Sequence, residues 1–368
     1  MYSSFSVISC CAKSKRVIIE SGGMEALLGH LQSDNPKIIM NCLLTMRNMS
    51  DLASGIPDGQ GLCIELVNIL RNPELSNPSE LVNISCATGI LANLTANNET
   101  LKLAVCNAGG VPALVNLLDR VPMNDERCRR DARDIFESAL SALKHLTNNH
   151  RAAEKVQQMF VFELNGLAIL NRNLNPNTNR GGLKGILNVI HNLLLKNPEN
   201  HEAIKREQFP RKIMMMLTWT MEQLLVSKCM CPLSSRLLAS ECDFIIVITP
   251  FFVLQQDPRG NHPVDNVRMT ELVDASLKCT TNFAKEPIYN DVIRDMESIR
   301  LFKNVLLHFA GDNKGPTETL LRLTIMIIEI IASSDLDGAF IIHQENIEQD
   351  VIRLANHSNQ KIGRYLNQ

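Results

Sequence analysis

Four segments of the chain repeat one pattern, and their spacing limits the folds that are possible. Each is an apolar run that ends in Asn or His, followed by Leu or Met and then by a short polar break: NCLLTMRNMSD, CATGILANLTANN, ALKHLTNNH and VIHNLLLKNPENH. We name the recurring polar residues the ladder residues; they are Asn48, Asn93, His145 and Asn192, spaced 45, 52 and 47 residues apart. A period near 45 residues is typical of stacked helical repeats, in which each unit buries its apolar face against its neighbours. A row of side-chain amides in such a stack is suited to holding the backbone of an extended peptide.

The composition agrees with a helical repeat protein. Of 368 residues, 45% are hydrophobic but only 4% are aromatic, so aliphatic side chains must form most of the core. Apolar residues recur at spacings of three and four, whereas strict alternation is rare. We therefore expect an all-α fold. The net charge of −2 indicates no general attraction to nucleic acid or to an anionic membrane.

The cysteines indicate neither a disulfide framework nor a metal site. There are eleven, and most lie inside apolar helical runs, where a free cysteine behaves as a small hydrophobic residue. Cys229, Cys231 and Cys242 lack the spacing of a zinc site, and no matching pair of histidines follows. The start of the chain, MYSSFSVISCCAKSKR, lacks the pattern of a signal peptide. The Asn-x-Ser/Thr sequences at Asn48 and Asn93 are then interpreted as coincidental matches to a glycosylation signal. We expect no metal and no cofactor.

The segments between the ladder residues complete a three-helix repeat. GGMEALLGHL (22–31), GLCIELVNIL (61–70) and GGVPALVNLL (109–118) each begin with a glycine that turns the chain into a short helix. A longer helix with the ladder residue near its end follows each one. Asn-Pro pairs mark breaks between helices, because Pro disfavours helix at the residue before it. This order is that of an armadillo repeat and predicts a right-handed superhelical solenoid of about six to seven such repeats. They would occupy 1–226, with the first repeat truncated, and 264–368, with the last truncated.

Residues 227–263 interrupt the fifth repeat and are predicted to be an irregular insertion. Their apolar run FIIVITPFFVL (244–254) is too short to span a bilayer. Three interpretations remain open: a loop folded onto the solenoid, a segment that binds a partner, or a stretch that is not present in the mature message. The lack of any repeat pattern favours the third.

Long ordered segments carry a resemblance to a known family. SGGMEALLGHL, MNCLLTMRNMSD, SCATGILANLTANNETLKLAVCNAGGVPALV and ALKHLTNNHRAAE resemble the β-catenin/Armadillo family, and so do IHNLLLKNPENHEAIKRE and PVDNVRMTELVDA. The resemblance implies a non-catalytic scaffold that binds acidic extended peptides in a concave groove. It implies as partners the cadherin cytoplasmic tail, TCF/LEF-type transcription factors and destruction-complex scaffold proteins. It further implies roles in cell–cell adhesion, Wnt signalling and transcriptional coactivation, with the protein in the cytoplasm, in the nucleus and at the adherens junction.

The resemblance also implies which residues line the groove. Asn48, Asn93 and Asn192 would each offer a donor and an acceptor to a peptide unit of the ligand. Lys102 matches the family's lysine that contacts a ligand aspartate. Five further residues would add positive charge: Arg47, Lys144, His145, Lys184 and His191. Leu44 replaces a tryptophan of the family, and Lys144 and His191 replace arginines, so the groove is expected to be less basic.

Other interpretations stay open for these residues and for the chain. An Asn near a helix end is often a C-terminal stop, His145 could be a core histidine, and Lys102 could be an ordinary solvated lysine. An importin-like cargo receptor also uses groove asparagines but would pair them with tryptophans, whereas the chain contains only Trp219. No phosphate-binding glycine loop, G-x-S-x-G turn or H-E-x-x-H helix points to an enzyme. Without a basic or aromatic stripe, direct nucleic-acid binding is not expected, nor is membrane insertion.

Overall fold

The described part of the chain is helical. The computed structural model describes residues 7–53, 56, 59–123, 129–148, 150–195, 197–229, 267–310, 315–334 and 336–356. These residues contain no β-strand, which confirms the prediction of an all-α fold. The chain divides into two compact units, Met1–Leu170 and Asn171–Gln368, and each is described by itself.

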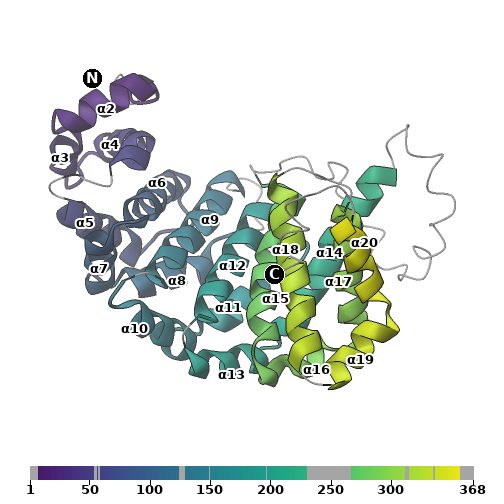
Figure 1. Ribbon diagram of the computed structural model, residues 1–368. Helices are drawn as coiled ribbons and strands as arrows, with labels where there is room; N and C mark the ends of the chain where they lie inside the picture. Colours follow the sequence, from purple (N-terminus) through teal and green to yellow (C-terminus); the bar gives the residue numbers. More distant parts are fainter. Residues whose placement is uncertain are drawn as a thin grey trace. The chain divides into compact units, whose positions relative to one another are not determined.

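The first unit consists of short helices that alternate with long ones. The long helices α4 (Pro36–Met49), α6 (Pro78–Thr95) and α9 (Arg129–Leu146) pack against one another in chain order (Figure 1). The other elements are α2 (Ala12–Glu20), α3 (Gly23–Leu28), the 3-10 turn η1 (Ser50–Leu52), α5 (Gly59–Arg71), α7 (Glu99–Asn107), α8 (Gly110–Arg120), α10 (Ala153–Gln158) and the π-helical turn η2 (Met159–Glu163). Helix α11 (Gly166–Asn173) contains the boundary between the units.

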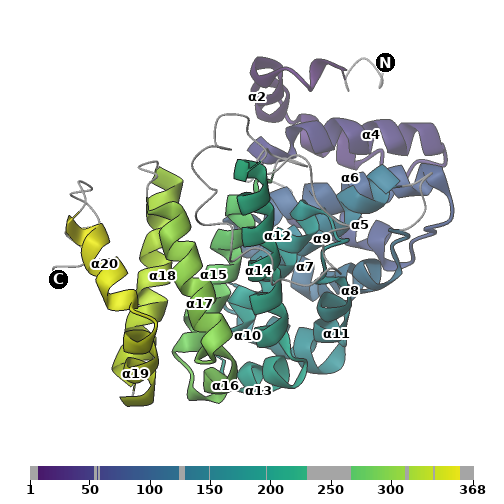
Figure 2. The same cartoon turned by 90° about the vertical axis from the view of Figure 1, so that its right-hand side faces the viewer.

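The second unit repeats the arrangement. Its long helices α12 (Arg180–Leu193), α15 (Met269–Ala284) and α18 (Gly315–Ser334) also contact one another in chain order (Figure 2). Helix α14 (Phe209–Cys229) packs against α15 and includes the first three residues of the predicted insertion; residues 230–263 lie outside the described part. The other elements are α13 (Pro198–Arg206), η5 (Pro287–Tyr289), α16 (Asn290–Ile293), α17 (Met296–Phe309), α19 (Leu336–Gln344) and α20 (Ile347–Asn356).

Asn-Pro pairs begin three of these helices. Pro36, Pro78 and Pro198 each occupy the first turn, where the missing N–H costs no helical hydrogen bond. The Asn35 side chain accepts a hydrogen bond from the backbone N–H of Lys37, and Asn77 accepts one from Ser79, both at 3.0 Å. These contacts satisfy donors that a helix start leaves unpaired. The predicted breaks are therefore helix starts; Asn35 and Asn77 cap theirs with a side-chain hydrogen bond, whereas Asn197 does not.

Gly-Gly pairs produce the turns before α3 and α8. Gly22 and Gly109 have φ angles of 77° and 79°, in the left-handed region that favours glycine. The second glycine of the later pair allows a close approach of two helices. A Cβ on Gly110 would lie 2.4 Å from Val105 Cγ1 and 2.8 Å from the Val105 carbonyl oxygen. The first glycine of the pair is thus needed for its backbone angle, and the second for the close packing of α7 and α8.

Aliphatic side chains form the interior. Leu43, Met46 and Met49 of α4 are fully buried. The same holds for aliphatic side chains on the next two long helices: Leu91 and Leu94 of α6, and Leu140, Leu143 and Leu146 of α9. Cys42, Cys63, Cys86 and Cys279 are buried free cysteines, and Cys106 is half-buried. Their predicted role as small hydrophobic residues is confirmed.

Within the described residues, no single helix is long and apolar enough to cross a membrane. Helices α7 and α8 reach the required length and composition only when taken together, and the chain bends by 75° between them.

We predict that Gly110→Ala lowers the free energy of unfolding by about 1–3 kcal/mol, because the new methyl group meets the backbone of Val105 and cannot be accommodated by a side-chain rotation. The measurement is urea denaturation followed by circular dichroism. Gly29→Ala is the matched control, since its nearest atom is the Ala26 carbonyl oxygen at 3.8 Å, and its effect should stay within about 0.5 kcal/mol. Equal effects of the two substitutions would contradict the packing argument.

Candidate functional site

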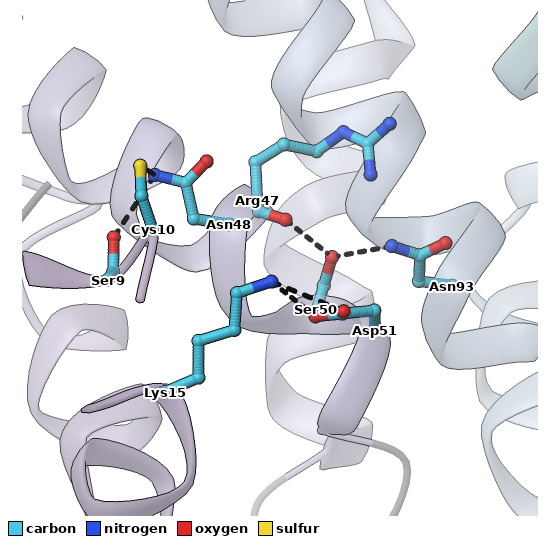
Figure 3. Close-up of polar contacts among 8 residues, drawn as sticks. All are labelled: Ser9, Cys10, Lys15, Arg47, Asn48, Ser50, Asp51 and Asn93. Carbon is cyan, nitrogen blue, oxygen red and sulfur yellow. Dashed lines mark hydrogen bonds and ion pairs between the residues drawn. The ribbon is translucent and has the colours of Figure 1, made fainter. Parts of the chain in front are cut away.

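The ladder residues of the first unit lie near the ends of its long helices, and two of them bond to the repeat before. Asn93 on α6 donates through Nδ2 to the Ser50 hydroxyl at 2.8 Å, and Asn48 on α4 donates through Nδ2 to the Ser9 hydroxyl at 3.1 Å (Figure 3). Ser9 and Ser50 are buried, whereas the two asparagines are half-buried. The amides are therefore contacts between repeats, a role that goes beyond the simple C-terminal stop considered from the sequence.

The serine hydroxyl determines how the Asn93 amide is turned. Ser50 Oγ donates its single proton to the Arg47 carbonyl oxygen at 3.0 Å, so it can only accept from Asn93. Asn93 must then present an N–H to Ser50, which leaves its carbonyl oxygen and a second N–H for other partners. Within the described residues, Asn93 makes no further side-chain hydrogen bond. An acceptor and a donor on one side chain match the N–H and C=O of a peptide unit.

The Asn-x-Ser sequence at Asn48 thus has a structural role. The hydroxyl of Ser50 lies two residues after Asn48 and receives the amide of the next ladder residue. The Thr hydroxyls two residues after Asn93 and His145 bond instead to carbonyl oxygens of their own helices, at Leu91 and Leu143. The Ser50 hydroxyl thus satisfies a carbonyl in the last turn of α4, whereas the Leu143 carbonyl also accepts from the backbone N–H of Thr147.

His145 occupies the ladder position on α9 but is not a source of positive charge. Burial lowers the pKa of His145 to about 4, and the charges of Lys144 and Lys102 lower it further. The ring is therefore neutral at pH 7 and offers one donor and one acceptor. The prediction that His145 adds positive charge to the groove is therefore corrected. Lys144 beside it is exposed.

Lys102 is buried, with 5% of its surface exposed, so the interpretation as an ordinary solvated lysine is wrong. Its Nζ donates from α7 to the Asn148 carbonyl oxygen at 3.0 Å. Two neighbouring side chains also bond to carbonyl oxygens at this helix end. Gln157 Nε2 donates to the Thr147 carbonyl oxygen at 2.8 Å, and His150 Nε2 lies 2.6 Å from the Leu146 carbonyl oxygen. Together these side chains cap the C-terminal end of α9, where a positive charge is favoured. Burial lowers the pKa of Lys102, and Glu99 opposes that change.

In the second unit the ladder has a position that the sequence analysis missed. Asn192 lies near the end of α12 and is buried, with 5% exposed. On α15, Asn282 precedes the buried Phe283 just as Asn93 precedes the buried Leu94. The Asn282 amide nitrogen lies 3.1 Å from His191 Nδ1. Since the amide nitrogen can only donate, Nδ1 accepts and the proton of the neutral ring resides on Nε2.

The cations expected in the second unit are less available than predicted. Lys184 forms an ion pair with Glu271 across α12 and α15, and Lys278 pairs with Asp274 at 2.6 Å. Burial lowers the pKa of His191, so its ring is neutral at pH 7 and the positive charge predicted there is corrected. Of the predicted cations, Arg47 remains half-buried in the first unit without an ion pair among the described residues.

No group of three His, Cys, Asp or Glu side chains in the described ranges is arranged to hold a metal ion. The polar groups that the described ladder positions bring together are hydrogen-bonding amides and side chains that cap helix ends.

Comparison with known proteins finds similarity to armadillo-repeat proteins. The sequence profile of the Armadillo/beta-catenin-like repeat matches residues 11–51, which include α2, α3 and α4. "Catenin beta" of Urechis caupo is 29% identical over 362 residues, which cover 98% of this chain and 38% of that protein. "Armadillo segment polarity protein" of Drosophila melanogaster is 30% identical over 303 residues, covering 82% of this chain and 31% of that protein. The chain thus spans about a third of the length of these relatives.

A solved structure shows the same fold. It comes from work on a conserved phosphorylation switch that controls the interaction between cadherin and beta-catenin, and it superposes with a TM-score of 0.74 at 22% identity. The match covers 99% of this chain and 63% of that chain. The resemblance to the β-catenin/Armadillo family and the armadillo solenoid are both confirmed.

The neutral His145 should make stability fall at low pH. Its folded pKa, about 4, lies below the ordinary value of 6.5, so the unfolded chain binds more protons between these pH values and stability is lost as the pH falls through them. We predict that wild type loses roughly 1–2 kcal/mol more of its unfolding free energy than His145→Asn between pH 7.5 and pH 5, with allowance for solvent screening. Chemical denaturation at the two pH values measures this, and equal losses in both proteins would show that the ring is not held neutral by the fold.

Proposed function

We propose that this chain, an armadillo-repeat protein similar to β-catenin and Armadillo, is a non-catalytic scaffold that binds acidic extended peptides along its long helices. The observation that carries the proposal is the orientation of the Asn93 amide. Its bond to Ser50 leaves a carbonyl oxygen and an N–H that an extended peptide backbone can meet. Asn48, Asn192 and His145, in equivalent positions, would extend the row within their units.

Backbone bonds of this kind hold a peptide without selecting its sequence, so selection would fall to the cations. Arg47 and Lys144 are accessible in the first unit, and Lys102 lies beneath the same end of α9. For Lys102 to contact a ligand carboxylate, its ammonium would use the donors that remain beyond the bond to Asn148. Lys184 and His191 contribute less, because the first is paired and the second is neutral.

Proteins similar to this chain suggest the class of ligand. The solved structure described above concerns cadherin and beta-catenin, which makes a cadherin-type cytoplasmic tail the first candidate. TCF/LEF-type factors and destruction-complex scaffold proteins are further candidates of the same acidic, extended kind. The corresponding roles are cell–cell adhesion and Wnt-type transcriptional coactivation, with the protein in the cytoplasm, in the nucleus and at adherens junctions.

An importin-like receptor for basic peptides is less well supported. Such a receptor would pair its ladder asparagines with exposed tryptophans, whereas Trp219 lies on α14 and is buried. Leu44 stands one turn before Asn48, where an aromatic platform would be needed.

We predict that an acidic peptide taken from a cadherin tail binds with a Kd below about 100 μM at low salt, and that Asn93→Ala weakens binding roughly 5–10-fold. The loss arises because two hydrogen bonds to the ligand backbone disappear. Isothermal titration calorimetry measures both. Asn107→Ala is the matched control, because this asparagine is exposed at the end of α7 and should leave the affinity unchanged.

Two results would contradict the proposal. Failure of the acidic peptide to bind, with binding of a basic peptide of equal length, would favour the importin-like alternative. Equal affinities for wild type and Asn93→Ala would leave the scaffold without its ladder contact.

A further inference from the structure

The side chain of Arg47 leaves α4 and lies against α6 at a residue without a side chain. A Cβ placed on Gly89 would be 2.2 Å from Arg47 Nε, 2.4 Å from Cζ and 2.8 Å from Nη2. All three atoms belong to the guanidinium group, so this planar group rests on the bare backbone of α6. Figure 3 shows the side chain extending over that helix, away from the Ser50 contact.

Backbone conformation does not explain this glycine. Gly89 lies inside an 18-residue helix and is not among the residues with positive φ. Glycine is less favourable than alanine in a helix interior, so an alanine would be expected here on helical grounds alone. The space that the glycine leaves is filled by Arg47.

The contact lies beside the ladder. Gly89 is one turn before Asn93 on α6, and residues four apart share a helix face. Arg47 directly precedes Asn48. The guanidinium at Gly89 therefore lies one turn from Asn93 on α6. It is also close to Cys86: burial raises the pKa of that thiol to about 11, and the charge of Arg47 opposes the rise.

The guanidinium makes no hydrogen bond or ion pair in the part of the chain that the structure describes. Acidic groups are nevertheless near, on α9. Desolvation raises the pKa of Asp134, and the charges of Arg130 and Arg47 oppose that rise while Asp131 adds to it. Charges of both signs therefore surround the guanidinium. Attraction of a ligand carboxylate to this surface then depends more on where the guanidinium lies than on the total charge.

We propose that Gly89 is a positioning residue that fixes the Arg47 guanidinium flat on α6, so that it meets a carboxylate of the bound peptide while Asn48 and Asn93 hold the backbone. The inference rests on the proposed function and names the feature that selects acidic side chains. A fixed planar guanidinium can donate two parallel N–H groups to one carboxylate, which a freely rotating cation does less well. Any side chain at position 89 would displace it.

A double-mutant cycle tests the inference. Affinities for the acidic peptide are measured by calorimetry for wild type, Gly89→Ala, Arg47→Ala and the double variant. We expect each single substitution to weaken binding about 5–10-fold, and Gly89→Ala to have less than a twofold effect in the Arg47→Ala background. A peptide with Gln in place of its acidic residues should bind wild type and Gly89→Ala with equal affinity.

Gly29→Ala is the control for a glycine without a close neighbour, and thermal unfolding of every variant establishes that each is folded. If Gly89→Ala weakens binding equally with and without Arg47, the glycine acts by another route and the inference is wrong. It is also wrong if wild type binds and Gly89→Ala binds equally well. If wild type itself does not bind the acidic peptide, the proposed function fails and the inference fails with it.

Discussion

Two long helices of the first unit, α4 and α6, each donate a hydrogen bond backward along the chain, from a ladder amide to a serine of the preceding repeat. Apolar packing brings α4, α6 and α9 together, but it does not determine how a half-buried amide is turned. The Ser50 hydroxyl does, because its only proton is used by the Arg47 carbonyl. One N–H of Asn93 therefore forms a hydrogen bond within the protein, and its second N–H and its carbonyl oxygen can bond to a ligand. Structure and proposed function use different atoms of the same side chain.

The same division of roles extends to the neighbouring charged residues. Lys102 caps the end of α9 from inside the protein, and Lys184 joins α12 to α15 through Glu271. The ammonium groups of both lysines are therefore already bonded within the protein. Arg47 differs, because its guanidinium lies on Gly89 with no ion pair among the described residues. The guanidinium is therefore a cation that is held in place, next to the amides that would hold a peptide.

What could be predicted from the sequence was mostly local. Asn-Pro helix starts, Gly-Gly turns and the apolar spacing act within a few residues, so the helices and their repeat were predictable. Contacts between distant residues were not. Lys102 and Asn148 are 46 residues apart, and Lys184 and Glu271 are 87 apart. Asn282 was overlooked, although it precedes an apolar residue in the sequence just as Asn93 does. The neutrality of His145 and His191 depends on burial, which no spacing reveals.

The side-chain amide resonances of the ladder asparagines report on the central claim most directly. In a ¹⁵N-labelled chain titrated with the acidic peptide, nuclear magnetic resonance follows the Nδ2 protons of Asn48 and Asn93, with Asn107 as an internal reference. We expect one of the two Nδ2 protons of Asn93 to shift strongly with saturation while the other, bound to Ser50, changes little. Saturable binding that leaves both Asn93 protons unshifted would show that the ladder amides belong to the fold alone.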